Sequence, residues 1–200
     1  MRSAAMVVVM AGVMGAIASP AGACLRRPPP QPKLAKQVDT TQRDVLAAEK
    51  ALTQGKHEQA AALARRAVPN LGQLPPADAA ALATRAQRTL AMATVRSGGA
   101  IEVVDGERPA NLAWAQLVLT YQSALARDNV VIQLQLAEAL AADEYQRGRA
   151  RTMLRDLSAR DVMPNAQGYA MLAQLEGDPS LRDAALGRCR DLGGAGGCKA

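Results

Sequence analysis

The sequence predicts an all-α protein, and its composition and residue pattern support this fold class. Hydrophobic residues make up 49% of the 200 residues and charged residues 21%, which is typical of a chain that folds around an apolar core. Alanine, the strongest helix former, is the commonest residue, whereas aromatic residues reach only 2% and phenylalanine is absent. Strands favour β-branched and aromatic side chains, so this balance argues against an all-β fold.

Residues 1–23 are predicted to be a secretory signal peptide. Arg2 is the only charged residue before Arg26, and an apolar run over 4–17 follows it and leads to the small residues Ala21-Gly22-Ala23. A basic start, a short apolar core and an A-x-A ending are typical of export signals. An uncleaved membrane anchor is the alternative, because the uncharged stretch is just long enough to span a bilayer.

Cys24 follows directly, and Ala21-Gly22-Ala23-Cys24 resembles the lipobox of bacterial lipoproteins, in which the cysteine is lipidated and becomes the mature N-terminus. Ala21 departs from this motif, which usually has leucine there. Residues 24–38 are proline-rich and basic, and we expect them to form an extended tether that holds a domain off a membrane, inner or outer. A soluble periplasmic protein with Cys24 as a free thiol is the alternative.

The net charge of +6 comes largely from this tether, because the chain from Thr40 onward contains 19 basic and 17 acidic residues. Nucleic-acid binding requires clustered basic residues and stacking aromatic residues, and the body has neither. The sequence therefore predicts no nucleic-acid partner.

Glycine, proline and Asn/Asp clusters divide residues 39–192 into eight expected helices, followed by a glycine-rich tail over 193–200. Asp39, Thr40 and Thr41 offer N-cap residues for the first helix, and Gly55 separates it from the second. Residues 100–107 are the only β-like stretch, and we expect an ordered loop there. The expected helices are 39–53, 57–68, 78–96, 109–126, 129–142, 144–160, 165–175 and 179–192.

The fifth and sixth helices show the clearest patterns. The fifth leaves few polar positions and should be largely buried. The sixth combines an apolar stripe with a row of arginines on another face. The stripe consists of Tyr145, Ala150, Met153, Leu154 and Leu157, and the row of Arg147, Arg151 and Arg155. The row is the best surface candidate for docking an acidic partner segment. A solvated face, partly paired with Asp143 and Asp156, is the alternative.

Weak internal repetition indicates pairs of helices. Arg155-Asp156-Leu157 recurs 35 residues later as Arg190-Asp191-Leu192, close to the 34-residue period of tetratricopeptide repeats. Residues 51–69 resemble that family's helical hairpin, with Gly55 at the turn and small alanines in the second helix. Residues 134–164 give a second match and 167–192 a degenerate third. The first helices lack the large aromatic residue that is usual in the family.

The resemblance implies a short right-handed superhelical array over 39–192, with residues 78–126 as either an irregular repeat or an inserted helix pair. A non-repeat helical bundle is the alternative. Trp114 and Tyr121 lie on one helix face within this segment, and we expect them to pack in the core; a binding hot spot is the alternative. His57 is the only histidine and is expected to pack, not to catalyse.

No catalytic motif, phosphate-binding loop or dinucleotide fingerprint is present, so we expect no enzyme, cofactor, metal site or small-molecule substrate. Cys189 and Cys198 would form a disulfide in an exported protein, or remain two free thiols. The resemblance implies a non-catalytic scaffold or assembly factor that binds a protein or peptide in a groove lined by the first helix of each pair. A structural helical-bundle spacer in an envelope complex is the alternative.

Overall fold

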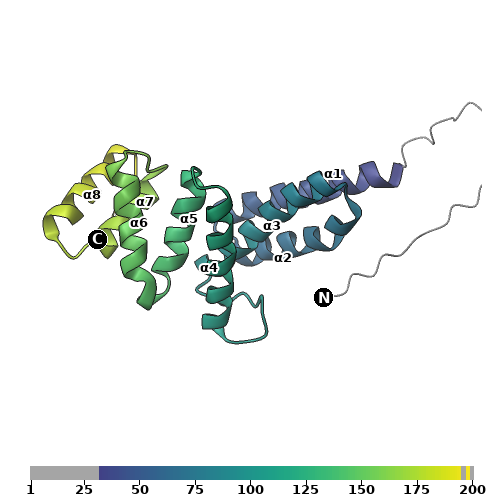
Figure 1. Cartoon of the computed structure of the whole chain (residues 1–200), viewed down its shortest axis with the longest axis horizontal. Helices are drawn as coiled ribbons and strands as arrows, with labels where there is room; N and C mark the ends of the chain where they lie inside the picture. The colour runs from purple at the N-terminus through teal and green to yellow at the C-terminus, as the bar shows by residue number, and fades with distance from the viewer. Residues whose placement is uncertain (1–31, 195–196, 199–200) are drawn as a thin grey trace, which may run out of the picture. The chain divides into compact units, whose positions relative to one another are not determined.

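The computed structural model describes residues 32–194 and 197–198, and it confirms the all-α fold class (Figure 1). Within these residues there are eight α-helices and no strand. The predicted signal peptide and Cys24 lie outside the described residues. The helices are α1 Pro32–Thr53, α2 His57–Ala67, α3 Pro76–Arg96, α4 Arg108–Leu125, α5 Val130–Ala141, α6 Arg147–Ala159, α7 Ala166–Leu175 and α8 Pro179–Asp191. The 3-10 segments η1 Val68–Gln73 and η2 Glu144–Gln146 precede α3 and α6.

Side-chain caps fix where three of the helices begin. Asn129 accepts hydrogen bonds from the backbone N–H groups of the first turn of α5, and Asp178 does the same for α8. Asn165 accepts one from the Gly168 N–H at the start of α7. These short polar side chains satisfy amide groups that no preceding helical carbonyl can reach. The three caps explain why the chain breaks close to the predicted positions.

The first helix begins at Pro32, so the prediction of an extended tether over 24–38 is wrong from residue 32 onward. Proline is well accommodated in the first turn of a helix, because its missing N–H would have no intrahelical partner there. The leucine, alanine, lysine and glutamine that follow are good helix formers. The proline-rich part of the sequence therefore ends where the helix begins.

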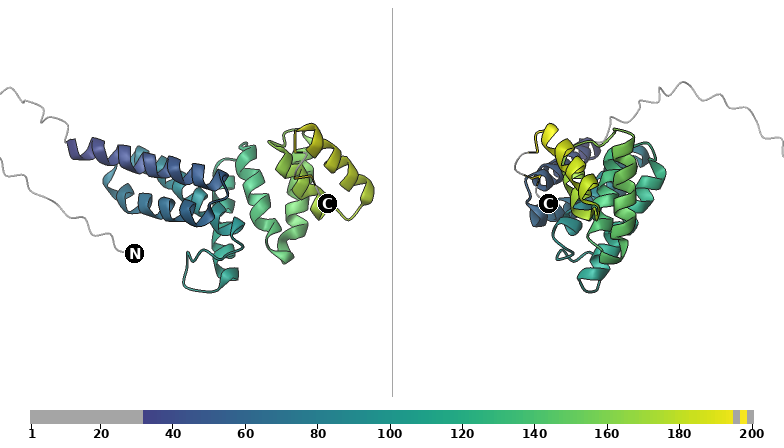
Figure 2. Two further views of the ribbon diagram at one scale, coloured as in Figure 1. Left: turned by 180° about the vertical axis from the view of Figure 1, so that it is seen from behind. Right: turned by 90° about the vertical axis from the view of Figure 1, so that its left-hand side faces the viewer.

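The helices pack in chain order, each against the next (Figures 1 and 2). A second set of contacts joins every other helix: α1 contacts α3, α3 contacts α5, and α5 contacts α7. No two even-numbered helices contact each other within the described residues. The four odd-numbered helices therefore form one continuous row, whose surface we call the odd-helix face.

Small side chains dominate the core. Alanines are fully buried where α1, α2 and α3 meet, which lets these helices approach closely. The fifth helix is largely buried, as predicted, through Ile132, Leu134, Leu136 and Leu140. In the sixth helix Ala150, Leu154 and Leu157 are buried and Met153 packs against them, as predicted.

Two tyrosines that were predicted to pack against other helices are exposed. Tyr145 is 94% exposed, because η2 interrupts the α-helical periodicity before α6 begins. Trp114 packs against the core, but Tyr121, seven residues further along α4, is 65% exposed. Seven residues advance about 10 Å along a helix, and a shared face does not ensure that a neighbouring helix covers both positions.

Candidate functional site

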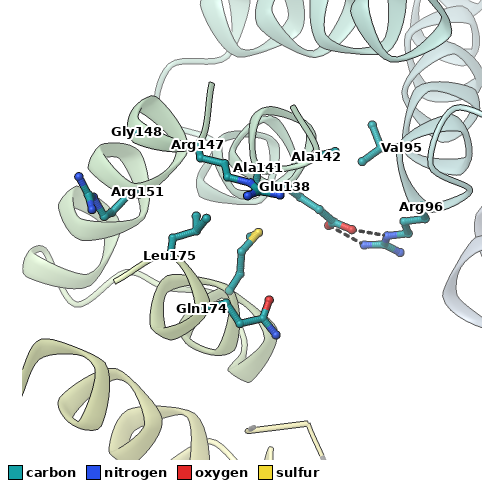
Figure 3. A pocket seen from close by; sticks show the side chains of 11 residues that line it. Val95, Arg96, Glu138, Ala141, Ala142, Arg147, Gly148, Arg151, Gln174 and Leu175 are labelled. Carbon is teal, nitrogen blue, oxygen red and sulfur yellow. Dashed lines mark hydrogen bonds and ion pairs between the residues drawn. The ribbon is translucent and has the colours of Figure 1, made fainter. Parts of the chain in front are cut away.

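One cavity lies on the odd-helix face, where the carboxyl-terminal ends of α3, α5 and α7 meet the first turns of α6 (Figure 3). Its volume is about 680 Å³, within the range of ligand-binding sites. It is lined by Val95, Arg96, Glu138, Ala141, Ala142, Arg147, Gly148, Arg151, Met171, Gln174 and Leu175. We call it the α6 cavity.

One ion pair is built into this cavity. Arg96 of α3 donates from Nε and Nη2 to the two carboxylate oxygens of Glu138 on α5, at 2.8 and 3.0 Å. Both side chains are mostly buried, with 26% and 15% of their surface exposed. The hydrogen bonds to Glu138 raise the pKa of Arg96. The pair ties α3 to α5 and occupies the only carboxylate that lines the α6 cavity.

Two of the three predicted arginines line the same cavity. Arg147 is exposed and Arg151 is half-buried, one turn further along α6. Figure 3 shows Arg147 directed toward Glu138 and Arg151 directed to the opposite side. Among the described residues, no hydrogen bond or ion pair joins either guanidinium group to the rest of the protein. Both are available to an anionic ligand.

Arg155, the third predicted arginine, does not line this cavity. Its Nε and Nη2 donate to the carboxylate of Glu176 at 2.5 Å, joining α6 to the end of α7. The Glu176 side chain is only 1% exposed. The hydrogen bonds from Arg155, with a smaller contribution from the Arg151 charge, hold the pKa of Glu176 below its ordinary value. Arg155 is therefore part of the fold's own ion-pair system.

A second cavity of about 350 Å³ lies further along the odd-helix face, between α1, α3 and α5. Glu49 of α1 accepts hydrogen bonds from Arg85 of α3 at 2.9 and 2.7 Å, while Arg88 lines the cavity without a hydrogen bond or ion pair among the described residues. We call it the α1 cavity. Its lining is Glu49, Leu52, Thr53, Arg85, Arg88, Thr89, Met92 and Gln135.

The two cavities lie along the same faces of α3 and α5. The α3 positions that line one or the other recur at helical spacing: 85, 88, 89, 92, 95 and 96. The α5 positions 135, 138 and 141 do the same, and Ala142 follows directly after the helix. Arg85, Arg88 and Arg96 were not predicted as site residues from the sequence. Their helical spacing indicates that they share one face of α3, but nothing in the sequence showed that other helices would leave this face uncovered.

A different kind of surface lies on α4. Leu117, Tyr121 and Leu125 follow one another at four-residue spacing and are 68%, 65% and 70% exposed. Arg108 is the only charged residue of this helix. We call these three residues the α4 stripe.

The remaining predicted residues lie outside these surfaces. Cys189 and Cys198 are joined by a disulfide, so of the two alternatives for this pair the structure contains the bond. His57 stands half-buried at the start of α2. Within the described residues, no group of three His, Cys, Asp or Glu side chains could hold a metal ion. No helix in that part of the chain is long and apolar enough to cross a membrane. Comparisons with protein-family models, curated proteins and solved structures find no match to this chain.

Proposed function

We propose that this protein is a non-catalytic scaffold or assembly factor of the bacterial cell envelope, which binds a protein or peptide on the odd-helix face. The observation that carries the proposal is the pattern of helix contacts. Odd-numbered helices contact one another in series, whereas no two even-numbered helices do so within the described residues. Contacts along one row only are expected when helix hairpins stack into an array that curves toward that row.

This pattern supports a right-handed superhelical array of the tetratricopeptide kind, in which the first helix of each hairpin lines the concave surface. Both cavities described above lie on the row that would be concave. In such an array, α3 and α4 take the place of one hairpin, and residues 78–126 are an irregular repeat. The groove would then combine side chains from all four hairpins.

Export to the periplasm and lipid anchoring at Cys24 belong to the same proposal. The Cys189–Cys198 disulfide supports an oxidising compartment, because disulfides rarely persist in the bacterial cytosol. The test is the intact mass of the protein from its native membrane fraction, beside a Cys24→Ser variant. A chain that begins at Cys24 with added acyl mass supports the anchor. An unmodified chain in the soluble fraction refutes it.

Site-specific photocrosslinking in the native envelope tests the binding function. A photoreactive residue at Gln174, exposed in the α6 cavity, is expected to give adducts with a partner protein. The matched control is Gln59, exposed on the even-numbered helix α2. Adducts from Gln59 alone, or equal adducts from both positions, would place the contact elsewhere and refute a groove on the odd-helix face.

A structural spacer module is the second candidate function, and the α4 stripe favours it. Three large exposed apolar residues on a helix with a single charge are typical of a surface that packs against another protein. If the protein acts as a spacer, Tyr121→Glu is expected to lower its oligomeric state in sedimentation experiments, while groove substitutions change nothing. A monomer in both forms would remove this candidate.

A further inference from the structure

We infer that the ligand of the odd-helix face is an acidic, extended peptide segment of a partner protein, whose carboxylates are bound by Arg147 and Arg151. This inference rests on the proposed function and names the chemical class of the partner.

Charge is distributed unevenly over the domain. Five arginines and two glutamates line the two cavities of the odd-helix face, and no lysine, aspartate or histidine does. Both glutamates are already held by arginines of α3. Arg88, Arg147 and Arg151 therefore remain without a hydrogen-bonded or ion-paired carboxylate among the described residues. The Arg151 charge acts at longer range on the carboxylate of Glu176. The arginines of the two cavities that have no bonded carboxylate leave the face with a positive charge, which makes it complementary to an acidic ligand.

The lining of the α6 cavity also suits a polypeptide. Val95, Met171 and Leu175 provide apolar surface beside the arginines, and Gln174 offers an amide that can both donate to and accept from a peptide backbone. Arginine binds carboxylates through two parallel hydrogen bonds, which fixes orientation as well as charge. The cavity therefore offers apolar, backbone-directed and carboxylate-directed contacts together.

The spacing of the two arginines matches an extended chain. Four residues along a helix advance about 6 Å, so this separates the backbone positions of Arg147 and Arg151. Alternate side chains of an extended peptide lie on one side, about 6.7 Å apart. Figure 3 shows Arg147 directed toward Glu138 and Arg151 directed to the opposite side, so two acidic residues separated by one other residue would meet both arginines once the Arg151 side chain turns toward the cavity.

A nucleic acid fits this surface less well. Proteins that bind single strands stack the bases on aromatic side chains, and neither cavity is lined by an aromatic residue. The charge of the face is also confined to arginines beside apolar groups, without the lysines that commonly track a phosphate backbone. The arrangement favours separate carboxylates over a continuous polyanion.

Selection from a phage-displayed library of random ten-residue peptides tests this inference on the mature chain. Three proteins are compared: the wild type, the double variant Arg147→Glu/Arg151→Glu, and Arg149→Glu. Arg149 is exposed on the same helix but does not line the cavity, so Arg149→Glu makes half of the double variant's charge change without the contact. Circular dichroism and urea unfolding establish that all three are folded, and fluorescence anisotropy measures the selected peptides in solution.

The wild type is expected to select peptides enriched in aspartate and glutamate, with acidic residues two positions apart. Each such peptide should bind the double variant at least about tenfold more weakly, and Arg149→Glu within about twofold of the wild type. An equal loss of peptide affinity in Arg149→Glu would show that nonspecific electrostatic attraction alone accounts for binding, and it would overturn the inference. Tighter binding of a single-stranded oligonucleotide than of every selected peptide would also overturn it.

Two further outcomes separate this inference from the proposed function. Peptides that lose binding in the double variant but contain no excess of acidic residues would overturn the acidic partner and leave the groove in place. Failure to select any peptide that depends on the odd-helix face would overturn both.

Discussion

Replacing Glu138 with glutamine is expected to weaken the fold and, at the same time, to strengthen binding of an acidic peptide. The Glu138 carboxylate accepts both hydrogen bonds from Arg96 and so joins α5 to α3. Glutamine keeps the shape of the side chain but removes its charge and one of its two acceptor oxygens. The substitution therefore weakens an internal bridge and frees a third cation in the α6 cavity.

The size of the stability change follows from burial. Exposed ion pairs contribute about 0.2–1 kcal/mol, whereas removing one partner of a fully buried pair costs about 3–5 kcal/mol. Arg96 and Glu138, at 26% and 15% exposure, lie between these cases. We expect Glu138→Gln to lower the free energy of unfolding by about 1–2 kcal/mol. Affinity for an acidic peptide should rise about three- to tenfold, because Arg96 becomes available to a ligand carboxylate.

Urea unfolding followed by circular dichroism measures the first effect in the wild type, Glu138→Gln, Arg96→Gln and the double variant. A coupling energy of about 1 kcal/mol between the two sites is expected from this cycle. Additive single substitutions would refute the stabilising role of the pair. Anisotropy with an acidic peptide measures the second effect, and unchanged or weaker binding to Glu138→Gln would refute the electrostatic argument for the α6 cavity.

Three further predictions concern the fold. Because the pKa of Glu176 is lowered in the folded state, the stabilisation it provides is fully present above its ordinary pKa of 4.5 and is lost as the pH falls through the lowered pKa. Arg155→Gln should therefore make the free energy of unfolding depend less on pH when it is measured from pH 6 to 3. Gly99→Ala should cost at least about 2 kcal/mol of unfolding free energy, because φ is +78° and the new Cβ would lie 2.5 Å from a backbone oxygen of α4; Gly98→Ala, with φ +63° and open space, should cost only about 1 kcal/mol. Reducing the disulfide, which spans nine residues, should lower the unfolding free energy by about 2–3 kcal/mol, and Cys198→Ser should remove this sensitivity to reductant.

The fold class and most helix boundaries could be predicted, because their causes are local in the sequence. Asn129, Asn165 and Asp178 cap helices within three residues of themselves, and alanine favours helix wherever it occurs. The start of α1 was missed because proline both breaks helices and opens them. Composition alone does not separate these two roles, and the prolines before residue 32 led to the prediction of a tether that included the helix formers after it.

The candidate site could be predicted only in part, because its electrostatics depend on partners far away in the sequence. The row of Arg147, Arg151 and Arg155 is uniform in sequence, yet Arg155 pairs with a glutamate 21 residues later, while the other two line a cavity. Each four-residue step turns the side chain by about 40°, so Arg155 lies about 80° from Arg147 and meets a different neighbour. Which of the three remained available depended on where α7 packs.

A glutamate–arginine ion pair joins two of the three pairs of neighbouring helices in the odd-helix row. Glu49–Arg85 bridges α1 and α3, and Glu138–Arg96 bridges α3 and α5. Between α5 and α7 the described residues contain no such bridge, and the larger cavity lies at this step with Arg147 and Arg151 at its side. An acidic ligand would bring carboxylates to the step that has no glutamate–arginine bridge among the described residues, beside Arg147 and Arg151. Binding should therefore also stabilise the packing of α7 against α5, and hydrogen exchange of α7 amides is expected to slow when an acidic peptide is bound.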